Sequence, residues 1–433
     1  MNVKTVTVVG ANGMMGSNVS AIFASFGGAR VYMVSRDIEK SKRAAMRAVA
    51  SVRADSIAPN LIPADYSMLE SCVRESDLVF ESVRESLEVK LAVAAEIKRY
   101  ARDDAVLCSG TSGLSITTLA ESYPERLRGR FFGVHMFNPP YHLTLCELTP
   151  TAYSDRALLA QLKEYLHGTL RRTVVEVKDS PAFLGNRVGF EFINRALLCA
   201  EEYKYSGGID YIDAILGPFT GRSMSPLVTS DFVGLDVHKA IVDNIWQNAP
   251  DYARDAFAFP AYAQALVAEG KLGRKTRCGL YKTEGEGEAK RRLVYDVSTG
   301  AYRDKMDYHF PFAEQMKKSI RTGDYRKAFE TLIENRSAEA ELCLRFLLQY
   351  IVYALYAADA VGYDIHAADD VMATGFNWCP PMAMAEALSA VCDLDGLAEE
   401  RLAGELPSDL DVRALLYKLE PSRYDYRLYF KSL

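Results

Sequence analysis

The chain has 433 residues, of which 49% are apolar and 25% charged, values typical of a soluble globular enzyme with room for two or three domains. Its formal net charge is −6, so it lacks the basic surface that nucleic-acid binding requires. The longest apolar stretch, residues 346–358, is interrupted by Gln349 and is too short to span a bilayer. We therefore expect neither a nucleic-acid partner nor a membrane partner.

The first residues lead directly into an apolar strand, so we expect no signal peptide. The eight cysteines are scattered along the chain without a CxxC pair, which is typical of reduced thiols in the cytoplasm. No spacing of cysteine and histidine indicates a metal site. We expect a cytoplasmic protein without a bound metal.

Short apolar strands alternate with helical patterns through the first 180 residues. The expected strands are Thr5–Val9, Arg30–Val34, Leu78–Glu81, Ala105–Ser109 and Arg130–Val134. Between the first two, apolar residues at helical spacing form a stripe of Val19, Ile22, Phe23 and Phe26. Strands separated by helices predict an α/β domain with a parallel, doubly wound sheet of the Rossmann type.

A glycine-rich turn joins the first strand to the following helix. Gly10 permits a tight turn, Gly13 lets the backbone approach a pyrophosphate, and Gly16 allows the helix to pack closely on the strand. The free N–H groups at the start of the helix favour phosphate, so the turn predicts a dinucleotide site rather than an unliganded glycine turn. The residues expected to contact the cofactor here are Gly10, Asn12, Gly13, Met14, Met15 and Gly16.

The end of the second strand carries Ser35 and Arg36, where a carboxylate would bind the ribose 2′-hydroxyl of NAD. A hydroxyl and a guanidinium suit a 2′-phosphate, so this pair favours NADP over NAD. Two alternatives stay open. Ser35 could instead cap the next helix beside a solvated Arg36, or Asp37 could turn inward and accept NAD.

Three polar segments follow strands at the edge where doubly wound sheets bind ligands. They are Gly110-Thr-Ser112-Gly, then His135-Met-Phe-Asn-Pro-Pro with Glu147 downstream, and then Asp179 to Arg187, which contains Asn186. Taken one at a time, these residues are also common as core, capping or surface groups.

Together these segments resemble the 3-hydroxyacyl-CoA dehydrogenase family. The family pattern is NTSS, then HFFNP with a glutamate twelve residues after the histidine, then DTPGFxxNR, and His135 and Glu147 keep that spacing. Glu81-Ser-Val-Arg-Glu with Lys90 is similar to the family's EAVxE segment and its downstream lysine, and residues 231–236 and 270–281 continue the match. The resemblance therefore covers nearly the whole chain.

The resemblance implies a role for each matching residue. His135 is expected to be the general base, with Glu147 orienting its ring. Ser112 and Asn186 are expected to hydrogen-bond the reacting oxygen. The remaining matching positions, Glu81 and Lys90, are expected to contact the cofactor, which is NADP or NAD.

Helical patterns dominate after residue 180, with helices expected over Phe183–Tyr205 and Val237–Asn248. The chain resembles the long bacterial members of the family, which implies two all-α domains like the C-terminal domain of 6-phosphogluconate dehydrogenase and no enoyl-CoA hydratase domain. The expected domains are 1–180 (dinucleotide-binding), 181–285 (first helical), 286–335 (a connector with a small hairpin) and 336–433 (second, degenerate helical). If the two helical copies cover each other, the chain is a monomer, and a homodimer is the alternative.

Three departures from the family pattern leave the substrate open. Gly110 stands where the family has asparagine, Thr144 replaces a basic residue, and only 30 positions separate Ser35 from Asp65, where the family has a longer arm that helps to hold CoA. The leading hypothesis is oxidation of a (3S)-3-hydroxyacyl-CoA to the 3-ketoacyl-CoA. The alternatives are a dehydrogenase of a non-CoA 3-hydroxy acid or cyclic alcohol, and a catalytically silent nicotinamide-binding protein.

Overall fold

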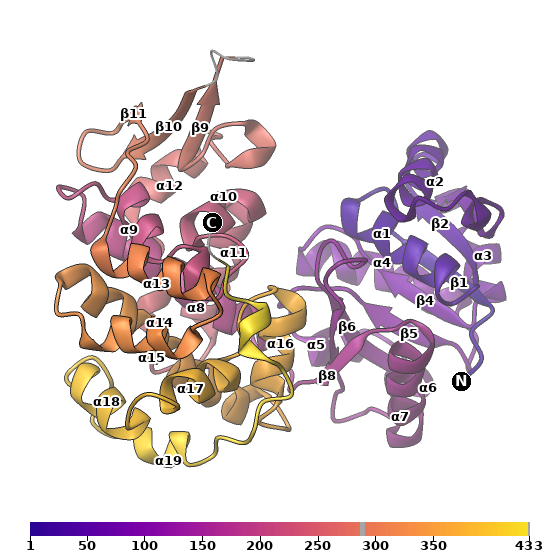
Figure 1. Cartoon of the computed structure of the whole chain (residues 1–433). Coiled ribbons are helices and arrows are strands. Elements are labelled where there is room, and N and C mark those ends of the chain that lie inside the picture. Colours follow the sequence, from indigo (N-terminus) through magenta and orange to yellow (C-terminus); the bar gives the residue numbers. More distant parts are fainter. Residues whose placement is uncertain (286–290, 432–433) are drawn as a thin grey trace. The chain divides into compact units, whose positions relative to one another are not determined.

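The computed structural model describes residues 1–285 and 291–431 and divides the chain into two compact units (Figure 1). The first unit comprises Met1–Phe183 with Val361–Tyr363, and the second comprises Leu184–Ala360 with Asp364–Leu433. The main change of unit falls between Phe183 and Leu184, and the predicted boundary near residue 180 stays a prediction. The second unit holds both predicted helical domains and the connector, so the boundaries between these three parts stay predictions.

The first unit is built on an eight-stranded sheet with the strand order β3-β2-β1-β4-β5-β6-β7-β8. The strands are β1 (Thr5–Val9), β2 (Arg30–Ser35), β3 (Leu61–Asp65), β4 (Leu78–Glu81), β5 (Val106–Ser109), β6 (Phe131–Met136), β7 (Leu145–Thr149) and β8 (Thr173–Glu176). All neighbouring pairs are parallel except β6 and β7, which are antiparallel. The five predicted strands and their parallel, doubly wound arrangement are confirmed, and β7, which was not predicted, runs antiparallel to β6.

Helices connect these strands and bury their apolar faces on the sheet. They are α1 (Met14–Ser25), α2 (Ile38–Val52), α3 (Leu69–Glu75), α4 (Leu87–Tyr100), α5 (Ile116–Glu121), α6 (Glu125–Arg128) and α7 (Arg156–Glu164). In α1 the predicted stripe is buried at Val19, Ile22 and Phe23, whereas Phe26 is 40% exposed and packs against the Tyr141 ring. The sheet and α1 thus share one apolar core beneath the glycine turn.

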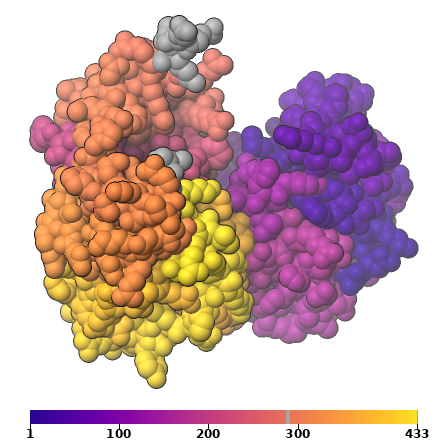
Figure 2. All heavy atoms as spheres, in the orientation of Figure 1, coloured from indigo at the N-terminus to yellow at the C-terminus, as the bar shows by residue number. Residues whose placement is uncertain are grey.

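The second unit is mainly helical. Its helices are α8 (Gly185–Glu202), α9 (Ile209–Ile215), α10 (Pro226–Val233), α11 (Leu235–Asn248), α12 (Ala261–Ala268), α13 (Pro311–Arg321), α14 (Tyr325–Glu334), α15 (Ala338–Val361), α16 (Ala367–Gly375), α17 (Pro381–Ser389), α18 (Leu394–Arg401) and α19 (Val412–Leu416). On its surface, segment 311–334 (orange) packs beside the C-terminal helices (yellow), where α14 contacts α17 (Figure 2). The predicted helices are confirmed as α8 and α11.

Helix α15 is longer than the apolar stretch at 346–358 suggested. It has 24 residues, which together with a hydropathy of 1.3 makes it long and apolar enough to cross a membrane, but 83% of that apolar window is buried inside the protein. Burial of this kind identifies the core helix of the second unit, since a membrane span exposes its apolar face to lipid.

A capping relationship occurs twice in the second unit and supports the predicted internal repeat. In α9, the Asp213 carboxylate accepts the backbone N–H of Leu227 at 2.8 Å, in the first turn of α10. In α16, the Asp369 carboxylate accepts the N–H of Met382 at 2.8 Å, in the first turn of α17. Both capped helices begin with proline, at Pro226 and Pro381. A long helix, α8 or α15, precedes each pair.

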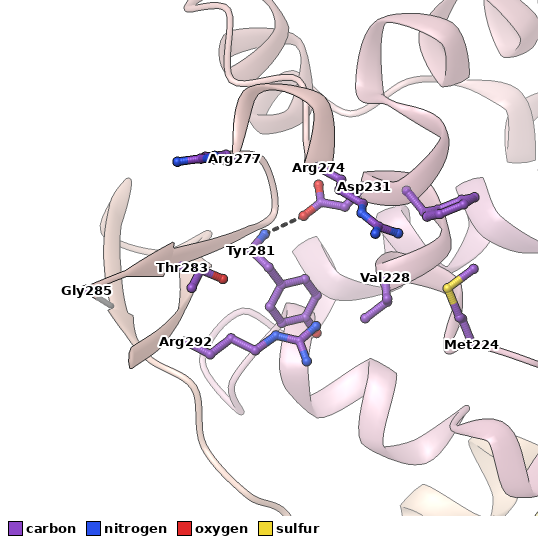
Figure 3. A pocket seen from close by; sticks show the side chains of 10 residues that line it. Met224, Val228, Asp231, Arg274, Arg277, Tyr281, Thr283, Gly285 and Arg292 are labelled. Carbon is purple, nitrogen blue, oxygen red and sulfur yellow. Dashed lines mark hydrogen bonds between the residues drawn. The ribbon is translucent and has the colours of Figure 1, made fainter. Parts of the chain in front are cut away.

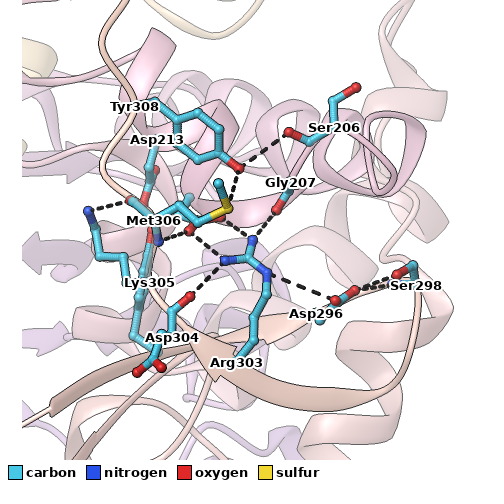
Figure 4. Close-up of polar contacts among 12 residues, drawn as sticks. Ser206, Gly207, Asp213, Asp296, Ser298, Arg303, Asp304, Lys305, Met306 and Tyr308 are labelled. Carbon is cyan, nitrogen blue, oxygen red and sulfur yellow. Dashed lines mark hydrogen bonds and ion pairs between the residues drawn. The ribbon is translucent and has the colours of Figure 1, made fainter.

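The predicted hairpin is confirmed, and it belongs to a three-stranded antiparallel sheet of β9 (Tyr281–Glu284), β10 (Arg291–Asp296) and β11 (Ala301–Asp304). Residues 286–290 of the predicted connector lie outside the described residues. Figure 4 shows how β11 is anchored: the Arg303 guanidinium donates to the carbonyl of Gly207 at 2.7 Å and forks onto Asp210. Two residues beyond β11, the backbone N–H of Met306 also donates to the Asp210 carboxylate, so one buried carboxylate holds the sheet on α9.

Candidate active site

His135 and Glu147 form a directly opposed pair on the two antiparallel strands β6 and β7. The Nδ1 atom of His135 lies 2.7 Å from Oε2 of Glu147. The His135 side chain is 8% exposed and the Glu147 side chain is fully buried, so the carboxylate is shielded from water and its charge is held at one face of the imidazole. The register of β6 and β7 thus places two side chains that are twelve positions apart in sequence within hydrogen-bond distance.

Aromatic rings fix the plane of the imidazole. The ring centroid of His135 lies 4.7 Å from that of Phe137 and 5.7 Å from that of Phe183. Among the described residues, no hydrogen bond involves Nε2, so this nitrogen is available to a substrate hydroxyl. The arrangement suits a general base whose second nitrogen is held by a carboxylate.

The Ser112 loop follows β5 and is held by acidic side chains. The backbone N–H of Ser112 donates to Glu85 at 2.9 Å, and the Asp179 carboxylate accepts the N–H groups of Ile116 and Thr117 at 2.9 and 2.8 Å, at the start of α5. The N-cap of α5 is Ser115, which contradicts the alternative that Ser112 is a helix cap. Among the described residues, the Ser112 hydroxyl forms no hydrogen bond.

Asn138 links the histidine segment to the glycine turn. Its amide oxygen accepts Nδ2 of Asn18 at 2.9 Å, and its own Nδ2 lies 3.2 Å from the sulfur of Met14, both residues of α1. In the sequence Asn138 is only part of the motif that begins at His135, and the resemblance predicts no role for it. This contact joins Asn138 to Met14, 124 positions away in sequence, so no local pattern predicts it.

The glycine turn has the tight geometry that the sequence predicts. Gly10 has a φ of +88°, and a Cβ there would lie 2.4 Å from the carbonyl oxygen of Ser82. A Cβ on Gly16 would lie 2.5 Å from the Gly10 carbonyl, whereas a Cβ on Gly13 would meet that carbonyl at 3.5 Å, an ordinary contact. Gly13 is the N-cap of α1 and no side chain caps it, so the N–H groups of the first turn, at Met14, Met15 and Gly16, face no capping side chain. The turn is further held by Arg47, which donates to the carbonyl of Asn12 at 2.8 Å.

The end of β2 differs in detail from what the sequence suggested. Ser35 is only 2% exposed, and its hydroxyl bonds to Ser41 at 2.7 Å and to the carbonyl of Asp37 at 2.9 Å. Asp37 itself is the N-cap of α2 and accepts the N–H of Glu39 at 2.8 Å, so the alternative that Ser35 caps this helix is wrong. Arg36 is exposed, and its positive charge partly opposes the burial that raises the pKa of Tyr66.

Glu81 and Lys90 form a buried ion pair. The Lys90 ammonium lies 2.9 Å from Oε1 of Glu81, and the same carboxylate accepts the hydroxyl of Ser109 at 2.7 Å and the N–H of Val83 at 2.6 Å. Lys90 also lies 3.3 Å from Glu85, which holds the Ser112 loop. The pair therefore braces the ends of β4 and β5, and its predicted contact with the cofactor stays a prediction.

The Gly110 position and the segment that follows His135 are both fixed by packing. A Cβ at Gly110 would lie 2.9 Å from the Phe80 ring, so the ring occupies the space that an asparagine side chain would need. The Tyr141 hydroxyl hydrogen-bonds Ser25 near the end of α1, and Arg172 donates to the carbonyl of Pro140. The segment after the histidine is thus pinned against α1.

Asn186 lies in the first turn of α8, in the second unit, and is buried. Because it belongs to the other unit, its predicted contact with the reacting oxygen stays a prediction. The four predicted catalytic residues are thus divided, with His135, Glu147 and Ser112 in the first unit and Asn186 in the second.

Comparison with known proteins gives consistent matches along most of the chain. Residues 5–180 match the family model described as the NAD binding domain of 3-hydroxyacyl-CoA dehydrogenase, and residues 183–283 match that of its C-terminal domain. A probable 3-hydroxyacyl-CoA dehydrogenase of Bacillus subtilis is 29% identical over 341 residues, which cover 77% of this chain and 41% of the relative. The mitochondrial hydroxyacyl-coenzyme A dehydrogenase of Sus scrofa is 30% identical over 294 residues, covering 65% of this chain and 91% of the relative.

Solved structures show the same fold. The 3-hydroxybutyryl-CoA dehydrogenase of Escherichia coli K12 superposes with a TM-score of 0.70 at 23% identity, covering 96% of this chain and 99% of that one. FadB2 of M. tuberculosis superposes with a TM-score of 0.58 at 27% identity over 65% of this chain and 99% of that one. The match to the Escherichia coli structure extends over both helical segments of the second unit. Because the two sequences are only 23% identical, this match shows the fold alone.

Proposed function

Because this chain belongs to the 3-hydroxyacyl-CoA dehydrogenase family, we propose that it oxidises the 3-hydroxyl of a (3S)-3-hydroxyacyl-CoA to the ketone and that His135 is the general base. Its family makes the chain a nicotinamide-dependent oxidoreductase. The observation that carries the catalytic proposal is the hydrogen bond of 2.7 Å between the buried Glu147 carboxylate and Nδ1 of His135.

Proton transfer follows from the state of the imidazole. With Nδ1–H donated to Glu147, the neutral ring presents the lone pair of Nε2 to the substrate hydroxyl. As the hydroxyl proton moves to Nε2, the ring becomes positively charged, and the Glu147 carboxylate stabilises that charge. In the reverse direction the same nitrogen returns the proton to the forming alcohol.

Ser112 and Asn186 are proposed to hydrogen-bond the reacting oxygen. The backbone N–H of Ser112 donates to Glu85, which fixes the loop. The Ser112 hydroxyl forms no hydrogen bond within the described residues, so it can donate to a ligand. A hydrogen bond to the oxygen is most valuable when it strengthens as charge develops there, which is the case in both directions of this reaction.

The glycine turn fits a dinucleotide. At Gly10 the turn leaves no room for a Cβ, and the N-terminus of α1 has no side-chain cap, so backbone N–H groups of Asn12 to Gly16 can receive the pyrophosphate. When bound, the nicotinamide supplies the hydride acceptor. The chain's own part is to hold the pyrophosphate at the turn and to keep the base in position, and the Glu81–Lys90 pair is proposed to support the cofactor side of the site.

NADP is proposed as the preferred cofactor, through Arg36 alone. The Ser35 hydroxyl is occupied by Ser41 and Asp37, so it contributes to shape rather than to phosphate binding. Asp37 holds the first turn of α2, and turning it toward a ribose would break that cap. An exposed guanidinium at the end of β2 suits a 2′-phosphate.

One assay tests the substrate class and the cofactor together. The purified chain is mixed with acetoacetyl-CoA and either NADH or NADPH, and the absorbance of the reduced nicotinamide is followed. Oxidation of the reduced nicotinamide that requires acetoacetyl-CoA supports the proposed reaction. Faster turnover with NADPH than with NADH supports the proposed role of Arg36. Turnover with free acetoacetate but not with its CoA ester would replace the CoA substrate by a non-CoA 3-hydroxy acid, which the short segment from α2 to β3 favours. Binding of the nicotinamide without any turnover would identify a silent binding protein.

A further inference from the structure

Three arginines line one cavity in the second unit, away from the residues assigned above. The cavity has a volume of about 570 Å³, within the range of small-molecule sites. Its lining includes Arg274, Arg277 and Arg292 from the segments around β9 and β10 (Figure 3). Each arginine is exposed, and none forms an ion pair within the described part of the chain. The three arginines bring positive charge to this cavity in a chain whose net charge is −6, and Asp231, which lines the same cavity, interacts electrostatically with Arg292.

Aromatic rings hold two of the guanidiniums in place. Arg274 lies over the Phe232 ring at 5.3 Å from its centroid, and Arg292 lies over the Tyr281 ring at 4.7 Å, as Figure 3 shows for the latter pair. Stacking fixes the plane of a guanidinium and leaves its N–H edge unpaired. Such edges match phosphate oxygens in a bidentate geometry.

Arg277 occupies a backbone position that favours glycine. It has a φ of +58° at the end of the short helical turn that contains Arg274. A side chain at positive φ is disfavoured, so the fold alone gives no reason for arginine there. The residue lines the cavity at its rim, where Figure 3 shows its side chain extending away from those of Arg274 and Arg292.

One carboxylate lines the cavity, and its burial disfavours the charged form. Asp231 accepts the backbone N–H groups of Leu280 at 2.8 Å and Tyr281 at 2.7 Å, which occupies both of its oxygens. Burial raises the pKa of Asp231 to about 7. It therefore repels an anion less than an exposed aspartate would.

We propose that this cavity binds a nucleotide with two or more phosphate groups, the chemistry that CoA and free ADP share. Arg274 and Arg292, held by their rings, receive the phosphates, and Arg277 adds positive charge at the rim. The inference concerns the second unit and does not depend on the proposed catalytic step. The nucleotide comes either from the CoA portion of a substrate or from a separate molecule.

Calorimetric titration of the full chain tests the site. CoA, dephospho-CoA and ADP are each titrated in the presence of saturating NAD⁺, so that the glycine turn is already occupied. Arg274→Gln and Arg277→Gly are each expected to weaken nucleotide binding about tenfold or more, the effect of one charge-assisted hydrogen bond. Arg277→Gly also relieves a disfavoured φ, so its melting temperature is expected to equal or exceed that of the wild type, which separates lost binding from lost folding.

Arg291→Gln is the matched control. Arg291 is the neighbour of Arg292 but pairs with Asp304 at 2.6 Å and does not line the cavity. Unchanged nucleotide affinity in both Arg274→Gln and Arg277→Gly, or an equal loss of affinity in Arg291→Gln, would overturn the proposed site. A raised KM for acetoacetyl-CoA with unchanged kcat in the pocket variants assigns the nucleotide to the substrate's CoA, whereas unchanged KM with lost ADP binding assigns it to a separate molecule. A wild type that binds ADP here but never turns over would contradict the proposed function and leave this site standing.

Discussion

His135 and Glu147 face each other at one directly paired position of β6 and β7, with 2.7 Å between Nδ1 and Oε2. Their strands are the single antiparallel pair in an otherwise parallel run of neighbours. The antiparallel pairing brings the carboxylate to the imidazole without a loop, so the geometry of the pair is fixed by backbone hydrogen bonds. A pair held in this way costs little reorganisation when the ring changes its charge.

The first prediction concerns the base. His135→Ala is expected to lower kcat by about 10² to 10⁴-fold, the usual effect of removing a general base. The affinity for the nicotinamide cofactor is expected to stay within about twofold, because the glycine turn and not the imidazole binds the pyrophosphate. Steady-state kinetics and equilibrium titration with the reduced cofactor measure the two effects.

His142→Ala provides the control, since His142 is an exposed histidine seven positions downstream. Its kcat is expected to match that of the wild type. Glu147→Gln tests the positioning role: it removes the charge that stabilises the protonated ring, so kcat is expected to fall while the affinity for the cofactor is kept. Wild-type kinetics in His135→Ala would remove the imidazole from the mechanism.

The second prediction concerns the cofactor. Arg36→Ala is expected to weaken NADPH binding about tenfold or more and to leave NADH binding nearly unchanged, because only NADPH carries the 2′-phosphate. Fluorescence titration with each reduced nucleotide measures the difference. Ser35→Ala is the matched comparison: its hydroxyl bonds Ser41 and Asp37, so we expect about 1 kcal/mol of lost stability and no change in cofactor preference. Equal losses for both nucleotides in Arg36→Ala would argue against NADP.

The sequence revealed most of the fold because its signals were local. β1 and β4 were predicted at their observed bounds, since each is a continuous apolar run that ends in a turn. The missed strand β3 carries Pro63 and is only half-buried, so it lacks such a run. β7 was missed although it carries Glu147, because a buried glutamate interrupts its apolar pattern.

The site was harder to predict from the sequence than the fold, because its contacts join residues that are far apart along the chain. The spacing from His135 to Glu147 came from a resemblance, whereas the reason for it, strand register, is visible only in three dimensions. Ser35 looked like a phosphate ligand, but a neighbour six positions later takes its hydroxyl. The Asp179 carboxylate accepts hydrogen bonds from the start of α5, and these contacts join residues 62 to 64 positions apart, beyond the reach of any local pattern.

The third prediction concerns pH and the two repeated caps. Burial raises the pKa of Asp213 and of Asp369 to about 6 in the folded chain, above the usual 3.8. A raised carboxyl pKa means that the folded state holds a proton that the unfolded state has released. The resulting stabilisation is therefore full below about pH 4 and is lost as the pH rises through about 6.

Urea unfolding at pH 5 and pH 7.5 measures this contribution. Asp369→Asn is expected to reduce the difference in the free energy of unfolding between these two pH values by about 1 kcal/mol, since asparagine does not titrate. Asp409→Asn, at an exposed position, is expected to leave the difference unchanged. An unaltered pH dependence in Asp369→Asn would show that the carboxyl does not titrate in this range.

The fourth prediction concerns a buried arginine between the two helical segments. The guanidinium of Arg222 lies 3.7 Å from the ring centroid of Phe192 and 4.9 and 5.0 Å from those of Trp378 and Tyr350. Burial lowers its pKa to about 10, and two of its nitrogens have no hydrogen-bond partner among the described residues. Rings on three sides compensate the charge only in part.

Two substitutions separate volume from charge at this position. Arg222→Ala leaves a cavity among the rings and is expected to cost about 2–4 kcal/mol of stability. Arg222→Met fills most of the space without a charge and is expected to be neutral or stabilising. Denaturant unfolding followed by tryptophan fluorescence, with Trp378 as a reporter, measures both. Equal destabilisation by the two variants would show that the positive charge itself holds the rings together.

The fifth prediction uses the glycine turn to separate binding from folding. Gly13 has an ordinary φ of −68°, and a Cβ there would meet only the Gly10 carbonyl, at 3.5 Å. Gly13→Ala is therefore expected to fold with a melting temperature close to that of the wild type. At Gly10 the φ of +88° and the contact of 2.4 Å with Ser82 make alanine incompatible with the turn, so Gly10→Ala is expected to lower both the melting temperature and the cofactor affinity.

Gly13→Ala isolates the backbone approach to the pyrophosphate. If the phosphates lie against the first turn of α1, the new methyl group holds them away from the N–H groups, and the affinity for NADH and NADPH should fall by about tenfold or more. Because the protein itself stays folded, near-ultraviolet circular dichroism is expected to be unchanged while the titration shifts. Wild-type affinity for both nucleotides in Gly13→Ala would mean that the cofactor binds without close contact to this turn, and the assignment of Asn12 to Gly16 would have to be abandoned.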